Sequence, residues 1–87
     1  METIKQLIQN GRLDEAIRQL DLYIHEHPHS DEAYFLRGKA YQKQGSLGLA
    51  LNNYLNAIAL NPDSPAQQAH DMLINILNFY NKDMYNH

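Results

Sequence analysis

The chain has 87 residues, with ten acidic and seven basic side chains and a formal net charge of -3. This acidic balance excludes the basic stripe of a nucleic-acid interface, and the lack of cysteine excludes disulfides. No run approaches the roughly 20 apolar residues of a membrane span, and the first residues do not resemble a secretory signal. We therefore expect a soluble, cytoplasmic domain that contacts neither nucleic acid nor membrane.

The residue usage favours helices, because valine is absent and threonine occurs once. Gly45 is a C-terminal helix signal, and Pro62 disfavours helical geometry in the residue before it. Ser30 and Ser64 are good N-caps, and Pro65 suits a first helical position. Together these signals predict helices over 2–10, 13–26, 31–44, 47–60 and 64–80, followed by a flexible C-terminal tail over 81–87.

The chain contains an internal duplication with an offset of 34 residues. The matched pairs are Gly11 and Gly45, Leu13 and Leu47, Ala16 and Ala50, Ile17 and Leu51, Leu20 and Tyr54, Ile24 and Ile58, and Pro28 and Pro62. An ordered set of this kind indicates one structural unit used twice. The turn at 44–46 is short, so the two helices that flank it are expected to be antiparallel neighbours.

The second copy resembles the tetratricopeptide repeat signature of spaced aromatic, small and proline residues. It reads Tyr34-Phe35-Leu36-Arg37-Gly38-Lys39-Ala40-Tyr41, followed by Gly45, Ala50, Tyr54, Ala57 and Pro62. The signature has leucine where Arg37 stands, and Leu36 lies beside that position. The resemblance is strong over 30–62 and partial over 1–28. It implies an all-α fold, a fragment of a right-handed α–α superhelix with five antiparallel helices.

The resemblance also implies a single domain over residues 1–80. Its parts are a partial first repeat at 1–29, a full second repeat at 30–63 and a capping helix at 64–80. The capping helix would cover the last repeat with an apolar face made of Ala69, Met72, Leu73, Ile76, Leu77 and Tyr80. The tail at 81–87 either frays, folds back into the concave groove that the resemblance implies, or docks into that groove of a neighbouring molecule.

Two patterns could carry chemistry, and neither predicts an enzyme. Residues 25–29 hold three alternating histidines, but His25 and His27 cannot share a helical face and Pro28 interrupts any strand. The acidic pairs at 14–15 and 31–32 lie in first helical turns, where the helix dipole favours them. We therefore expect no catalytic residue, no metal site and no cofactor.

In the tetratricopeptide family, the first helix of each repeat lines a concave groove that holds partner peptides. Carried over by position, the resemblance places Lys5, Ile8, Gln9, Glu32, Phe35, Lys39, Gln42 and Lys43 in that groove. Lys5, Lys39 and Lys43 are three of the four lysines in the chain. Either they attract an acidic peptide or a C-terminal carboxylate, or they only solvate a helix face. The predicted function is a protein–protein interaction module, an adaptor or scaffold.

Residues 46–62 contain no charged side chain, which predicts an alternative function. The strip of Gly48, Asn52, Asn56 and Ala59 is neutral and small. Either the helix over 47–60 is enclosed between its neighbours, or the strip is a contact between two copies of the chain. In the second case the protein is a structural, self-associating helical module, with a weak homodimer and no separate peptide ligand.

Overall fold

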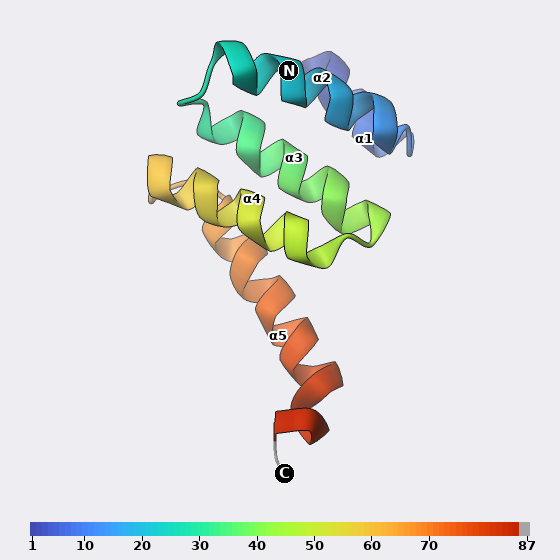
Figure 1. Cartoon of the computed structure of the whole chain (residues 1–87), viewed down its shortest axis with the longest axis vertical. Coiled ribbons are helices and arrows are strands. Elements are labelled where there is room, and N and C mark those ends of the chain that lie inside the picture. Colours follow the sequence, from blue (N-terminus) through green and yellow to red (C-terminus); the bar gives the residue numbers. More distant parts are fainter. Residues whose placement is uncertain (86–87) are drawn as a thin grey trace.

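The computed structural model describes the backbone of residues 1–85 and the side chains of residues 1–79. This part of the chain contains helices and no strands, so the predicted all-α fold is confirmed (Figure 1). None of its helices is both long and apolar enough to cross a membrane. In chain order the helices are α1 (Glu2–Gln9), α2 (Leu13–Glu26), α3 (Asp31–Gln44), α4 (Leu47–Leu60) and α5 (Ala66–Tyr85).

The ends of α5 differ from the prediction, whereas α2, α3 and α4 have the predicted bounds. The helix begins two residues later than predicted, at Ala66, and Ser64 caps it as predicted, because its buried Oγ accepts the N–H of Ala66 at 3.0 Å. No glycine or proline interrupts residues 66–85, so the helix continues past the predicted end at 80. The backbone at 81–85, predicted as a loose tail, is helical. Residues 86–87 of that tail lie outside the described residues.

The duplication is visible in the backbone of the two glycine turns. Gly45 has a φ of 91° and its N–H donates to the carbonyl of Gln42 at 3.1 Å. The N–H of Ser46 donates to the carbonyl of Tyr41 at 2.9 Å. This pair of bonds is a Schellman motif, and α1 ends in the same pair around Gly11, whose φ is 78°. Both helical hairpins therefore turn in the same way.

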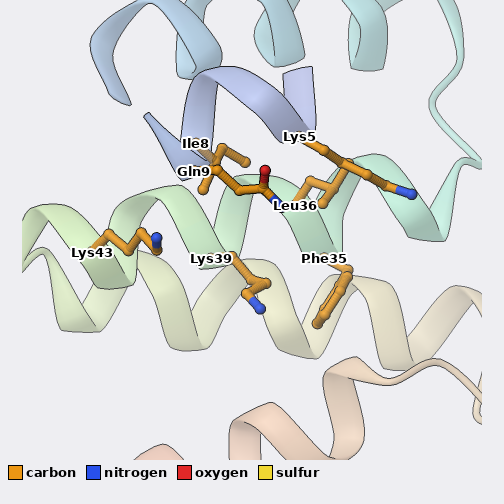
Figure 2. Close-up of a pocket in the computed structure, with 7 residues that line it drawn as sticks. All are labelled: Lys5, Ile8, Gln9, Phe35, Leu36, Lys39 and Lys43. Carbon is orange, nitrogen blue, oxygen red and sulfur yellow. The ribbon is translucent and has the colours of Figure 1, made fainter. Parts of the chain in front are cut away.

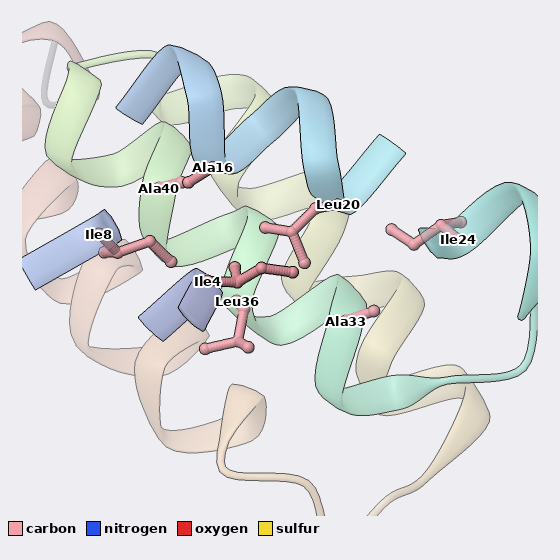
Figure 3. Packing of buried hydrophobic residues seen from close by; sticks show 8 residues of the cluster. All are labelled: Ile4, Ile8, Ala16, Leu20, Ile24, Ala33, Leu36 and Ala40. Carbon is pink, nitrogen blue, oxygen red and sulfur yellow. The ribbon is translucent and has the colours of Figure 1, made fainter. Parts of the chain in front are cut away.

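The helices pack mainly against their neighbours in sequence, and α5 leaves the stack across α4 (Figure 1). One hydrophobic cluster joins α1, α2 and α3 (Figure 3) and consists of Ile4, Ile8, Ala16, Leu20, Ile24, Ala33, Leu36 and Ala40. A second cluster joins α4 to α5 and consists of Ala50, Tyr54, Ala57, Ala66 and Leu73. Tyr34 and Phe35 of α3 pack against both clusters and so connect them.

The departure from the family signature at position 37 has a structural reason. Leu36 is 5% exposed and takes the apolar position in the first cluster. Arg37 instead connects three helices: its Nη1 donates to Asp21 on α2 at 2.8 Å, and its Nε donates to buried Asn53 on α4 at 2.7 Å. Its guanidinium also lies 5.4 Å from the ring centroid of Tyr34. The leucine is thus displaced by one residue, and the arginine ties α2 to α4.

The apolar face predicted for the capping helix is partly wrong. Leu73 is 2% exposed against α4, whereas Met72 is 59% exposed and Ile76 is 46% exposed. Because α5 packs chiefly on one helix, α4, only a narrow stripe of α5 is covered. That stripe contains Ala66, Ala69, Leu73 and Leu77. The side chain of Tyr80 lies outside the described part.

The crossing of α3 and α4 generates a prediction for Gly38. A Cβ at this position would lie 2.5 Å from Cε1 of Tyr54, whose ring is fully buried, and 3.2 Å from the carbonyl oxygen of Ala50. We expect G38A to lower the free energy of unfolding by about 1–3 kcal/mol, because overpacking displaces the ring or the helix.

Urea denaturation followed by circular dichroism measures this change, with G48A as the matched control. A Cβ at Gly48 meets no atom within 4 Å, so G48A should be neutral or stabilising by up to about 1 kcal/mol. Equal stability of the two variants would contradict the prediction.

Candidate functional site

The side chains of α1 and α3 enclose a groove of about 250 Å³ (Figure 2). We call it the lysine groove, and its lining residues are Lys5, Ile8, Gln9, Phe35, Leu36, Lys39 and Lys43. Each hairpin contributes its first helix, because the glycine turns send α2 and α4 back on the other side. Two repeats therefore suffice to form both walls.

The groove combines an apolar base with cationic side chains. Ile8 and Leu36 are 4% and 5% exposed, so they belong to the core as well as to the base of the groove. The Nζ of Lys39 lies 5.6 Å from the ring centroid of half-buried Phe35. Among the described residues, no carboxylate pairs with Lys39 or Lys43. These two ammonium groups are therefore available to an anionic ligand.

Lys5 is already engaged by acidic neighbours. Its Nζ lies 3.3 Å from Glu2 and 3.6 Å from Glu32. The hydrogen bond to Glu2 raises the pKa of Lys5, and the charges of Glu2 and Glu32 raise it further. Lys5 thus stays protonated, but its charge is partly compensated. The cationic part of the groove is centred on α3.

A second hollow of about 310 Å³ adjoins the lysine groove on the side of α5. The two hollows share Lys5, Phe35 and Leu36. The second is completed by Asp31 and Glu32 from α3 and by Ser64 and Pro65 before α5. The concave surface therefore continues from α1 across α3 to the start of α5.

The structure brings most of the predicted site residues together. Lys5, Ile8, Gln9, Phe35, Lys39 and Lys43 line the lysine groove, and Glu32 lines the adjoining hollow. Gln42 lines neither, because its Oε1 accepts the hydroxyl of Tyr54 at 2.6 Å. Their roles in binding stay predictions.

Sequence reasoning missed four lining residues: Leu36 in the lysine groove, and Asp31, Ser64 and Pro65 in the adjoining hollow. For Leu36 the signal was the displaced signature position beside Arg37. For Pro65 there was none beyond its place at the start of a helix.

The three histidines of residues 25–29 lie at the C-terminal end of α2 and in the turn that follows it. The ring of His27 lies 4.5 Å from that of Tyr23, centroid to centroid. Within the part of the chain that the structure describes, no group of three or more histidines and carboxylates is arranged to hold a metal ion. The ordinary role of such residues, at a helix end and in a loop, accounts for them.

Comparisons with known proteins agree with this architecture. A family model for the tetratricopeptide repeat matches residues 31–64, which include α3, α4 and the turn after them. A solution NMR structure of the Bacteroides fragilis protein BF1650 is similar at a TM-score of 0.88 and 55% identity. That similarity covers 98% of this chain and 87% of the other. No curated protein matches the chain.

The burial of Tyr54 generates a pH prediction. Burial raises the pKa of Tyr54 to about 12, whereas an unfolded tyrosine ionises near pH 10. The unfolded state therefore loses this proton first, and the stability contributed by Tyr54 is lost as the pH rises from about 10 through 12. We expect Y54F to lose less unfolding free energy than wild type over this range.

Urea denaturation at closely spaced pH values between 9 and 12 measures both slopes. The other tyrosines and the lysines are the same in both proteins, so the difference between the slopes reports Tyr54. Parallel slopes would show that Tyr54 ionises alike in the folded and unfolded states.

Proposed function

Because the chain belongs to the tetratricopeptide repeat family, we propose that it is a protein–protein interaction module that holds a peptide segment in its lysine groove. Repeats of this family generally mediate interactions between proteins and are not catalytic. An adaptor or scaffold role and a cytoplasmic location are part of the proposal. The observation that carries it is a concave surface with buried apolar residues at its base and, above them, two lysines that pair with no carboxylate among residues 1–79.

The chemistry of the groove favours an acidic ligand. Lys39 and Lys43 are one helical turn apart on α3, so they can contact neighbouring carboxylates of one segment. Exposed ion pairs contribute only about 0.2–1 kcal/mol each. Most of the affinity must therefore come from apolar contacts with Phe35 and the base of the groove, while the lysines select the sign of the ligand's charge.

Charge reversal in the groove tests this function. We expect the K39E/K43E variant to bind acidic peptides at least tenfold more weakly than wild type, because attraction becomes repulsion. The peptides are selected from a displayed random library on wild type, and their affinities are measured by titration calorimetry. R12E/R18E is the matched control, because it makes the same change in net charge at exposed positions before and within α2, away from the groove.

Chemical-shift mapping on the same peptides locates the site. Shifts in α1 and α3 that are absent from K39E/K43E support the proposal, whether or not they extend to α5. If K39E/K43E and R12E/R18E weaken peptide binding equally, the loss of affinity comes from the net charge of the protein and not from the groove. Shifts confined to α2 and α4 would place the binding site outside the groove.

A second candidate function rests on the outer face of α4. This helix packs between α3 and α5, yet its neutral strip stays exposed, and so do three large side chains next to it. Leu49 and Leu55 are each 49% exposed and Leu60 is 38% exposed. An uncharged exposed face of this kind is typical of contact surfaces. A second copy of the chain packed on α4 is therefore the alternative to a peptide ligand.

Assembly through α4 predicts a dimer that charged residues disrupt. Under this function, the N52K/N56E variant should be monomeric at concentrations where wild type is dimeric, because both positions are exposed on the strip. Light scattering coupled to size-exclusion chromatography over a wide range of concentration measures the molar mass. K39E/K43E should leave the dimer intact. A wild type that stays monomeric at millimolar concentration would remove this candidate.

A further inference from the structure

The middle of α5 carries an exposed apolar stripe made of Met72, Ile76 and Phe79. Their side chains are 59%, 46% and 68% exposed. The spacing of four and three residues places them on one side of the helix, and residues 72–81 include no charged residue. A helix that only caps a solenoid needs a polar outer face. The α5 stripe therefore calls for a function beyond capping.

The stripe lies on the same side of the molecule as the lysine groove. Pro65 lines the hollow beside Phe35, and the N–H of Ala69 donates to its carbonyl at 3.2 Å, so Pro65 is in helical register with α5. At about 100° per residue, Met72 and Ile76 project within roughly 20° of the direction of Pro65. The concave surface thus continues from the lysines of α3 onto the α5 stripe.

From this continuity we infer that the α5 stripe is a second, apolar half of the ligand site, an inference that rests on the proposed function. The ligand is a peptide segment with acidic residues at one end and bulky apolar residues at the other. Its acidic end contacts Lys39 and Lys43, and its apolar end packs on Met72 and Ile76. The two ends of the ligand are assigned in this way because the positive charges are on α3, whereas the α5 stripe has no charged residue.

The dimensions of the site agree with a short extended ligand. At a rise of about 1.5 Å per residue, Lys39 lies about 6 Å along α3 from Phe35. By the same rise, Met72 lies about 10 Å along α5 from Pro65. Neighbouring helices add about 8–10 Å, so a segment from Lys39 to Met72 covers roughly 25 Å. An extended chain spans this distance with about eight residues. The groove and the stripe can therefore be occupied by a single linear segment.

A second copy of the chain fits the α5 stripe less well than a peptide. Large apolar side chains have areas of about 200 Å², so the three exposed fractions amount to roughly 350 Å². A stable dimer buries about 800 Å² on each partner. The stripe is too small for such an interface by itself, but it suffices for two or three side chains of a peptide that is anchored elsewhere.

Four fluorescein-labelled synthetic octapeptides test the inference by fluorescence anisotropy. The acidic–apolar peptide has four glutamates followed by four leucine and phenylalanine residues. The acidic–serine peptide replaces the apolar half by serines, and the serine–apolar peptide replaces the acidic half by serines. The fourth peptide has the residues of the first in scrambled order. On wild type we expect the acidic–apolar peptide to bind at least tenfold more tightly than the acidic–serine peptide and the scramble.

The M72S/I76S variant should reduce this ratio to near one while keeping the wild-type affinity for the acidic–serine peptide. L22S is the matched control, because Leu22 is 67% exposed on α2, outside the groove, and it should behave as wild type. Circular dichroism checks that the three proteins have the same helix content. K39E/K43E should weaken both acidic peptides alike.

The outcomes separate this inference from the proposed function. The inference is wrong if wild type binds the acidic–serine peptide as tightly as the acidic–apolar peptide. It is also wrong if M72S/I76S keeps the tenfold difference in affinity between these two peptides. In either case the proposed function of the lysine groove is unaffected. If neither acidic peptide binds wild type, both fail. A wild-type dimer that M72S/I76S converts to monomer would assign the stripe to a second copy and overturn the inference.

Discussion

The close approach of α3 and α4 at Gly38 is the constraint on which the rest of the structure depends. Tyr54 fills the space that a side chain at position 38 would occupy, and its ring is fully buried. On one side this ring lies 6.1 Å from that of Phe35, centroid to centroid, and its hydroxyl holds Gln42. Through Phe35 the crossing sets the base of the concave surface. Through the cluster around Tyr54 it sets the position of α5.

Charge and apolar packing have separate tasks in this molecule. The one arginine that ties helices together is mostly shielded, with a side chain 20% exposed, and its two hydrogen bonds are short. The lysines of the groove are more open and contribute little to the fold. Exposed ion pairs such as that of Lys5 with Glu2 contribute little to the folding free energy. Their main effect is on the local charge of the surface. The two buried clusters and the Arg37 contacts hold the helices together, so the groove lysines stay available for the proposed ligand.

Local signals in the sequence were enough to predict much of this fold. Gly11 and Gly45 end their helices with positive φ, and Ser30 caps α3 by accepting the N–H of Ala33 at 3.2 Å. These features depend on residues close in sequence, so pattern reasoning finds them. The groove was predicted from the resemblance. Leu36 lines it in addition to the predicted residues, and Glu32 lines the adjoining hollow. Gln42 lines neither, because its Oε1 accepts a long-range hydrogen bond from Tyr54. Such a bond has no local signature.

The orientation of α5 could not be predicted for a related reason. Periodicity shows that a helix has an apolar arc, but it does not show how much of the arc the neighbour covers. For α5 the arc includes both Leu73 and Met72, and α4 covers only the first. Packing geometry, which depends on both helices, decides between them.

The length of α1 has a consequence for how binding and folding are linked. With eight residues, α1 is shorter than the roughly 12–15 residues that an isolated helix needs in water. Ile4 and Ile8 therefore hold it in place by packing on the first cluster. Since α1 also supplies one wall of the lysine groove, any opening of α1 removes half of the site. A ligand that bridged α1 and α3 would stabilise the docked α1 by an amount that grows with the ratio of ligand concentration to Kd, so that binding and the folding of α1 would be linked.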